Sequence, residues 1–171
     1  MAQAPQQLIR PMQASDLETV LAWRNHPDVR DFMYTKHEIT LAEHTAWFAK
    51  ASRDAQRHLM IFESNEVPVG FSNLHQIAEG GIADWGFYTA PEAVKGTGRA
   101  LGKAALEYAF VELGLHKVCG QALAFNQRSI RFHDNLGFQQ EGVLRQQHFD
   151  GQRYHDVVCF GLLASEWQTN N

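Results

Sequence analysis

The sequence predicts an α+β domain, or a three-layer α/β/α domain, and three observations support this fold class. The chain has 171 residues, which is enough for one domain with a sizeable core and too few for two ordinary ones. Hydrophobic residues make up 44% of the chain, which is typical of a globular protein. Segments with the period of strands alternate with segments with the period of helices, and no repeat or linker divides them. We therefore expect a single domain over residues 8–167, with a flexible tail at residues 1–7 and a second tail at residues 168–171.

The first part of the chain contains one expected strand and two helix starts. Residues 8–12 have the pattern of a strand. The sequence Ser-Asp-Leu-Glu at residues 15–18 has the spacing of a capping box, in which a hydroxyl and a carboxylate bond free backbone N–H groups at a helix start. We expect His26-Pro27 to interrupt this helix, because proline disfavours the helical conformation of the residue before it. A second box, Thr-Leu-Ala-Glu at residues 40–43, predicts a helix that reaches about residue 53.

Three expected strands follow, at residues 58–63, 67–76 and 82–89. A short polar turn at residues 64–66 joins the first two, and Gly80-Gly81 precedes the third. Turns this short connect antiparallel neighbours, so we expect an antiparallel meander.

After Pro91 the pattern changes to that of a helix, with an apolar face that includes Leu101, Ala105 and Tyr108. Gly114 is a plausible C-terminal stop for this helix. The remaining expected elements are a strand at residues 118–125, a helix at 129–136, and a hairpin of strands at 143–149 and 153–162 around Asp150-Gly151.

Composition and charge argue against several classes of protein. The net charge is -4, so we expect no nucleic-acid partner. Apolar runs never approach the roughly 20 residues that span a bilayer, and the N-terminus lacks the pattern of a secretory signal. Cys119 and Cys159 form no CxxC pair and cannot build a disulfide framework. We therefore expect a soluble, cytoplasmic protein with reduced thiols and no membrane partner.

The segment Val94-Lys95-Gly96-Thr97-Gly98-Arg99-Ala100 lies between an expected strand and an expected helix. Closely spaced glycines let a backbone approach a ligand, and the first turn of a helix offers unpaired N–H groups to a pyrophosphate. Lys95, Arg99 and Lys103 give this region a local charge of +3. The glycines alone favour a solvated basic face on an ordinary helix. They match neither the dinucleotide GxGxxG spacing nor a Walker loop.

A second segment runs from Asn126 to Phe138, with Ser129 three residues after the asparagine and Gly137-Phe138 at its end. Together the two segments resemble the GNAT family of acetyl-CoA-dependent N-acetyltransferases. That resemblance implies a mixed, mostly antiparallel central sheet and acetyl-CoA as the acetyl donor, with no metal. Ala93 departs from the family, which often has Arg or Gln at that position. The resemblance places the coenzyme against Phe87, Tyr88, Val94, Lys95, Gly96, Thr97, Gly98, Arg99, Ala100, Asn126, Ser129, Phe132 and His133.

The N-terminal half is similar to the PseH-type subfamily, which acetylates UDP-4-amino-4,6-dideoxy-N-acetyl-β-L-altrosamine in pseudaminic acid biosynthesis, a route to flagellin glycosylation. The similarity rests on Trp23-Arg24-Asn25-His26-Pro27, on Phe32-Met33-Tyr34, and on His44 with Trp47 one helical turn later. It implies a small-molecule nucleotide-sugar substrate that contacts Arg24, Met33, Tyr34, His44 and Trp47. An arginine suits phosphate oxygens, and aromatic or thioether surfaces suit a flat base. Met33 and Trp47 are also ordinary core residues in type.

Acetyl transfer needs a neutral amine, a site for the oxyanion, and a departing thiolate. The resemblance places the acetyl carbonyl at backbone N–H groups near residues 85–88, where the fourth strand diverges from the fifth. Asp84 is a candidate general base, and its alternative is a surface carboxylate. His133 stands where many members of the family carry a tyrosine near the sulfur. It is a candidate acid, hydrogen-bond donor or proton relay, and its alternative is a hydrogen-bonded helix histidine.

Other functions remain open at this stage. The hairpin around Asp150-Gly151 is shared with GNAT enzymes that acetylate polyamines or protein N-terminal amines, so it does not discriminate between substrates. Arg24 does discriminate, because a cation suits a diphosphate and not a polycation. A non-catalytic acyl-CoA-binding module on the same fold is a further alternative. The histidines have no metal-ligand spacing, and a homodimer is an open possibility.

Overall fold

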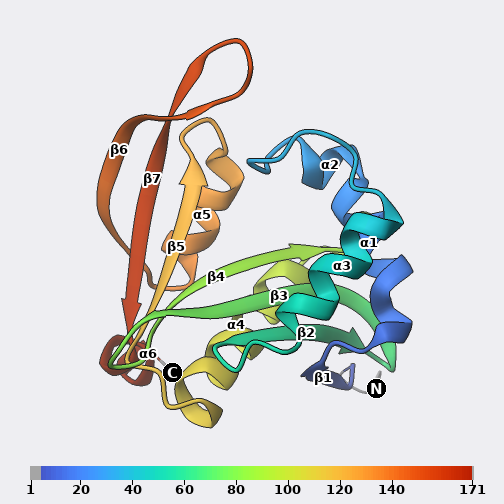
Figure 1. Cartoon of the computed structure of the whole chain (residues 1–171). Helices are drawn as coiled ribbons and strands as arrows, with labels where there is room; N and C mark the ends of the chain where they lie inside the picture. Colours follow the sequence, from blue (N-terminus) through green and yellow to red (C-terminus); the bar gives the residue numbers. More distant parts are fainter. Residues whose placement is uncertain (1–4, 171) are drawn as a thin grey trace.

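The computed structural model describes residues 5–170, with side chains up to residue 168, and it is built around one seven-stranded sheet (Figure 1). The strands are β1 (Gln7–Pro11), β2 (Arg57–Ser64), β3 (Val67–Ala78), β4 (Ile82–Thr89), β5 (Lys117–Leu123), β6 (Gln139–Phe149) and β7 (Tyr154–Leu163). Their order in the sheet is β1-β2-β3-β4-β5-β7-β6. Only β4 and β5 run parallel, and all other neighbours are antiparallel. The predicted mixed, mostly antiparallel sheet is confirmed.

Helices cover both faces of this sheet. They are α1 (Leu17–Asn25), α2 (Pro27–Arg30), α3 (Leu41–Ala51), α4 (Thr97–Glu107), α5 (Gln127–Asn135) and α6 (Ala164–Asn170), with a 3-10 turn at Ala14–Asp16 and a π turn at Tyr108–Glu112. Phe71 of β3 packs in one core cluster with Val20 and Trp23 of α1. Leu74, which points to the opposite side of the same strand, packs in a second cluster with Leu106 of α4. The structure therefore has the three layers that the element order predicts.

The helix starts confirm one predicted cap and correct the other. At α3, Thr40 Oγ1 accepts a hydrogen bond from the Glu43 N–H at 3.2 Å, and the Glu43 carboxylate accepts one from the Thr40 N–H at 2.7 Å. The box predicted at residues 15–18 is wrong. The Asp16 carboxylate accepts from the Gln13 N–H instead, at 2.7 Å, because Arg10 holds that carboxylate at 2.8 Å. This shifts the start of the helical segment to Ala14.

The chain ends in a helix that the sequence analysis did not predict. Helix α6 covers most of the tail expected at residues 168–171, and its Trp167 is buried beside Phe110. At the other end, Gln7 already belongs to β1, and residues 1–4 of the expected tail lie outside the described residues. Among the described residues, no helix combines the length and the apolar character needed to cross a bilayer.

The feature that positions the site is the short pairing between β4 and β5. Their parallel ladder joins Ile82 to Lys117 and ends where Asp84 pairs with Cys119. Beyond this point β4 continues to Thr89 and β5 to Leu123 without pairing with each other. The opening begins at residue 85, which is where the sequence analysis expects the strands to diverge. Figure 1 shows the two strands separating, with β5 rising toward α5 and β4 running toward α1 and α3.

Candidate functional site

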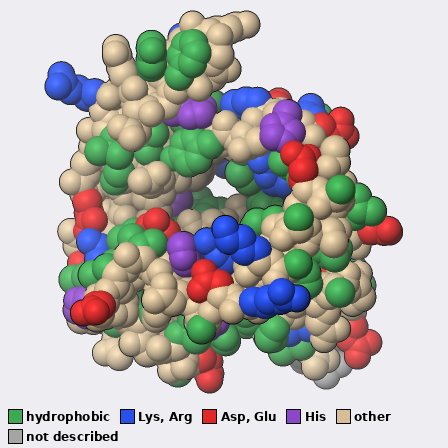
Figure 2. All heavy atoms as spheres, in the orientation of Figure 1, with side chains coloured by type: hydrophobic (Ala, Val, Ile, Leu, Met, Phe, Trp, Pro, Cys, Tyr) green, Lys and Arg blue, Asp and Glu red, His purple; other side chains and the backbone are tan. Residues whose placement is uncertain are grey.

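A cavity of about 440 Å³ occupies the space between the diverging strands. Figure 2 shows the molecule hollowed at its centre. One wall is formed by β4, by the start of α4 and by α5, and it includes Phe87, Gly98 and Phe132. The Phe87 and Phe132 rings are 4.5 Å apart and form an apolar surface. A thioester arm needs such a surface, because its chain is apolar between its amides.

The start of α4 has the geometry of an anion site. Gly96 caps the helix with φ +97°, a conformation that L side chains rarely adopt, and Thr97 begins the helix. The Thr97 hydroxyl donates to the Val94 carbonyl at 2.8 Å and so stabilises the turn itself. The N–H groups of Gly98 and Arg99 belong to the first turn, where a helix offers no internal acceptors. A Cβ added at Gly98 would have no neighbour nearer than 3.9 Å, so the backbone there is open to a ligand.

These features fit the pyrophosphate of coenzyme A. The side chains of Lys95 and Arg99 are exposed beside the turn, and the first turn of α4 contains no acidic residue. Positive charge at a helix N-terminus favours an anion. Gly102, unlike Gly98, lies against packed side chains, because a Cβ there would lie 2.7 Å from Leu136 and 2.8 Å from Phe132. It allows α4 to pack closely against α5.

Asn126 and Ser129 lie on the same wall of the cavity. The Asn126 Oδ1 accepts a hydrogen bond from the Ser129 N–H at 3.1 Å, so this side chain caps α5. Asn126, Arg128 and Ser129 are the polar residues that the start of α5 contributes to the lining of the cavity.

His133 is almost completely buried, at 1% exposure. Its Nδ1 is 2.8 Å from the Ser129 carbonyl and therefore carries a proton, and its Nε2 accepts a hydrogen bond from Trp85 Nε1 at 3.1 Å. Burial lowers the pKa of the imidazole, which is therefore neutral at pH 7. The ring also stacks on Phe160 at 4.6 Å. With both nitrogens bonded inside the protein, this arrangement favours the alternative of a hydrogen-bonded helix histidine, and the acid or relay role stays a prediction.

Asp84 lies at the last pair of the β4–β5 ladder and lines the cavity. Partial burial raises the pKa of its carboxyl, while the nearby His75 imidazole opposes that shift. The side chain faces the layer of α1 and α3, as Tyr88 does, because the two residues are separated by an even number of positions on β4. Its position suits a base that receives a proton from an amine at the opening of the sheet. The role itself stays a prediction.

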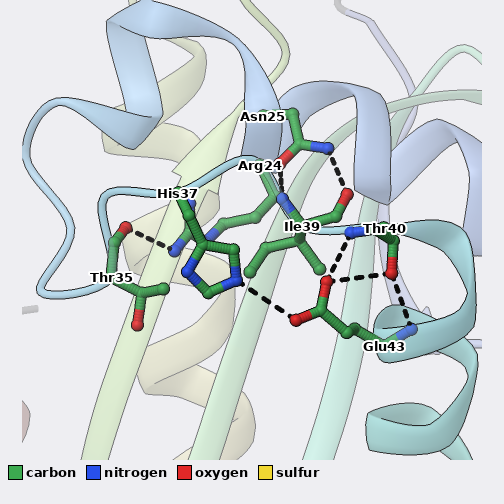
Figure 3. Close-up of polar contacts among 7 residues, drawn as sticks. All are labelled: Arg24, Asn25, Thr35, His37, Ile39, Thr40 and Glu43. Carbon is green, nitrogen blue, oxygen red and sulfur yellow. Dashed lines mark hydrogen bonds and ion pairs between the residues drawn. The ribbon is translucent and has the colours of Figure 1, made fainter.

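Arg24 of α1 and His44 of α3 form a second group of polar side chains. Arg24 Nη2 donates to the Thr35 carbonyl at 3.2 Å, as Figure 3 shows, whereas its Nη1 is buried without a partner among the described residues. The His44 ring bonds the backbone of Leu17 and leaves its Nε2 buried and equally unpartnered. Burial lowers the pKa of His44, and the charge of Arg24 lowers it further. Arg24 also interacts with Tyr88, which reaches the cavity.

Of the other three predicted substrate residues, two line the cavity and one is packed in the core. Met33 and Tyr34 line the far side of the cavity, near β5. Trp47 stacks on His44 at 5.1 Å and packs edge-on against Phe71, within the core cluster beneath α1. Its surroundings favour the core alternative, with the indole supporting the His44 ring. The structure therefore brings Arg24 and His44 together, and Arg24 also bonds the Thr35 carbonyl, directly after Tyr34.

Several cavity residues escaped the sequence analysis, among them Asp28, Arg128 and two residues of β5. Cys119 and Gln121 of β5 both line the cavity on the side of Tyr34. Neither belongs to a motif, and only the register of β5 against β4 and β7 decides that their side chains face the opening. Within the described residues, no group of three His, Cys, Asp or Glu side chains could hold a metal ion.

Comparison with known proteins adds three findings. Residues 7–139 match a family model described as an acetyltransferase (GNAT) domain. Over 90 residues the chain is 37% identical to the prophage-derived N-acetyltransferase YokL of Bacillus subtilis, a match that covers 51% of each protein, so the chain spans about half the length of that relative. Over 128 residues it is 25% identical to acetyltransferase PseH of Campylobacter jejuni, covering 74% of this chain and 79% of PseH.

The fold has a close counterpart among solved structures. Spermidine N-acetyltransferase from Vibrio cholerae, in complex with CoA and spermine, superposes with a TM-score of 0.88 at 25% sequence identity. The match covers 95% of this chain and 98% of that one. That structure holds CoA, the ligand to which the start of α4 is suited here.

Proposed function

Because the chain belongs to the GNAT family of acetyl-CoA-dependent N-acetyltransferases, we propose that it acetylates the 4-amino group of a UDP-linked 4-amino-4,6-dideoxy sugar. Such a reaction belongs to biosynthesis of the pseudaminic acid type. The proposal concerns the identity of the acceptor, and it rests on residues in the N-terminal part of the chain.

The observation that carries the proposal is the unpartnered Nη1 of Arg24, beside which the neutral His44 ring adds no competing positive charge. A buried polar group without a partner costs about 1–3 kcal/mol, and more if it is charged. A diphosphate supplies several acceptor oxygens, and a guanidinium binds such oxygens in a bidentate fashion. Tyr88 connects this pair to the cavity. A phosphate oxygen of the acceptor would therefore satisfy the Arg24 Nη1 donor, which has no partner among the described residues.

The part of the cavity wall that contains Met33 and Tyr34 suits a flat ring. Both side chains supply broad, polarisable surfaces. A nucleoside diphosphate sugar could then lie with its phosphates toward Arg24 and its amine toward Asp84. This orientation brings the amine to the point where β4 and β5 separate.

In the proposed reaction, the neutral amine attacks the carbonyl carbon of the thioester. Backbone N–H groups of β4 near residues 85–88, free of β5, stabilise the oxyanion. Asp84 takes up the proton that the nitrogen loses, directly or through one water. The C–S bond then breaks, and CoA leaves as a thiolate. Here His133 acts as an internal support, because its hydrogen bond fixes the Trp85 ring beside this segment.

The test compares Arg24→Met with Arg53→Met, a matched loss of an exposed arginine at the end of α3. Acetylation of UDP-4-amino-4,6-dideoxy-β-L-AltNAc is followed by CoA release and by mass spectrometry of the product. We expect Arg24→Met to raise the KM for the sugar roughly 10- to 100-fold, as for a hydrogen bond to a charged group, and Arg53→Met to leave it unchanged. The Kd of acetyl-CoA, from calorimetry, should stay within about twofold. An unchanged KM in Arg24→Met contradicts the proposed pocket.

A polyamine acceptor is the second candidate, and two carboxylates favour it. Asp28 and Asp84 both line the cavity, and carboxylates bind ammonium groups. The structurally similar Vibrio cholerae enzyme was solved with spermine. The same assay with spermidine separates the candidates, because Arg24 should hinder a polycation. A higher kcat/KM for spermidine than for the UDP-sugar would replace the nucleotide-sugar proposal.

A further inference from the structure

The connection between α2 and α3 crosses the cavity. We call residues 32–36 the strap. Figure 1 shows this connection extending from the layer of α1 and α3 toward β5 and α5. Three consecutive strap residues, Phe32, Met33 and Tyr34, line the cavity. The strap therefore forms part of the wall that an acceptor would meet.

Side chains attach the strap to β5 and to the loop after it, while its Thr35 carbonyl accepts a hydrogen bond from Arg24 Nη2 at 3.2 Å. The Tyr34 hydroxyl donates to Gln121 Oε1 of β5 at 2.9 Å. The Phe32 ring lies 6.1 Å from the Phe125 ring, and Lys36 Nζ lies 5.8 Å from the same ring. These contacts join two parts of the molecule whose strands pair over only three positions.

The base of the strap is fixed much more firmly. The Asn25 side chain makes two hydrogen bonds of 2.8 Å to the backbone of Ile39, one as donor and one as acceptor (Figure 3). The capping box of Thr40 follows directly. By contrast, Phe32 is 44% exposed and Tyr34 is 49% exposed. A segment with a rigid base and a few exposed contacts at its tip can swing without unfolding its neighbours.

The size of the cavity gives a reason for such a movement. Pockets for one small ligand usually measure about 300–1,000 Å³, and this cavity measures about 440 Å³. Acetyl transfer requires the thioester arm and the acceptor in the same space. This volume is at the lower end of the range for one ligand, so the position of the strap limits the space that the thioester arm and the acceptor share.

We propose that Gln121 is a positioning residue of the acetyl transfer, because its hydrogen bond to Tyr34 holds the strap closed over the acceptor after the strap has opened to admit it. The inference rests on acetyl transfer in this cavity and applies to either candidate acceptor. Gln121 acts through Tyr34 and touches none of the reacting atoms in this role.

The kinetic test removes each half of the hydrogen bond. Tyr34→Phe keeps the ring and loses only the hydroxyl, and Gln121→Leu keeps the length and loses the acceptor oxygen. Each should lower kcat/KM for the acceptor roughly fivefold, the value of one neutral hydrogen bond, and leave the Kd of acetyl-CoA unchanged. The double variant should be no worse than either single variant, because one contact is lost only once.

Two further variants make the result specific. Gln121→Glu keeps an oxygen for the Tyr34 hydroxyl and should retain most of the activity. Tyr154→Phe removes the hydroxyl of an exposed tyrosine on the β6–β7 hairpin and should change nothing. Multiplied effects in the double variant, or a Gln121→Glu variant as weak as Gln121→Leu, would overturn the inference.

Hydrogen exchange supplies a measurement that needs no acceptor. Gln121→Leu should speed exchange of the backbone amides of residues 32–36 and leave those of α3 unchanged. Equal exchange in the two proteins means that the hydrogen bond does not hold the strap, even if the wild type acetylates its acceptor. If the wild type acetylates neither the UDP-sugar nor spermidine, the proposed function fails, and the exchange result still decides whether the strap is held as described.

Discussion

Replacing His133 with leucine distinguishes an internal support from a catalytic acid. The change removes the acceptor of the Trp85 Nε1–H bond and the donor to the Ser129 carbonyl, while a side chain of similar volume fills the space. The buried Trp85 N–H then has no partner, which costs about 1–3 kcal/mol. The lost bond to Ser129 adds about 1 kcal/mol, because that carbonyl keeps its helical partner. We expect the free energy of unfolding to fall by about 2–4 kcal/mol.

The assay pairs urea unfolding with a pH–rate profile. For a chain of this length the loss corresponds to a melting temperature lower by roughly 2–4 °C per kcal/mol. A supporting residue should slow turnover less than about tenfold, through displacement of Trp85, and leave the shape of the pH profile unchanged. If turnover instead slows by about two to four orders of magnitude while stability is undiminished, the reasoning is refuted and His133 is established as an acid.

The pH dependence of stability gives the same substitution a second readout. Burial places the pKa of His133 in the folded protein below its value of about 6.5 in the unfolded chain. The unfolded state therefore binds more protons in acid. The contribution of His133 is complete above about pH 6.5 and is lost as the pH falls toward the folded pKa. His133→Leu should show a shallower loss of stability on acidification than the wild type.

Two other substitutions test the sheet and the base. In Gly120→Ala, the new Cβ would lie within 3 Å of both the His133 ring and Trp85 Nε1, so we expect about 2–4 kcal/mol of destabilisation by urea unfolding. Gly142→Ala is the matched control, because its Cβ meets nothing within 4 Å, and equal stability of the two variants would contradict the packing argument. Asp84→Asn should slow turnover by about two to four orders of magnitude. In the wild type, kcat/KM should fall as the pH drops through the raised pKa of Asp84. This acidic limb of the pH–rate profile should vanish in Asp84→Asn. An unchanged profile would exclude Asp84 as the base.

Local signals along the chain account for most of the fold. The capping box at Thr40 and the proline at residue 27 act over a few residues, and both mark helix boundaries where expected. The turns at residues 64–66 and 80–81 connect antiparallel strands, as their composition predicts. The box at residues 15–18 does not form, because a residue of the preceding strand bonds the Asp16 carboxylate. Arg10 of β1 holds Asp16, and no pattern within residues 15–18 contains that information.

The functional site also combines features that local sequence patterns predict with features that only the tertiary structure creates. Motif spacing located the start of α4 and the face of α5, because a bound pyrophosphate needs backbone geometry that local residues create. The contributions of Gln121 and Cys119 depend on the register between β5 and its neighbours, which sequence spacing does not encode. The same holds for the hydrogen bond between Arg24 and the Thr35 carbonyl, which joins two separate segments of the chain.

The sequence by itself determined the class of the protein, an acetyl-CoA-dependent N-acetyltransferase, because the motifs that bind the coenzyme are local segments. Only the tertiary structure decided the state of His133. Its lack of a free nitrogen follows from Trp85, 48 residues earlier in the chain, and from the glycine at position 120 that leaves room for both rings. A side chain's type and position follow from the chain, whereas its hydrogen-bond partners and hydration, which set its pKa, follow from the residues that folding places around it.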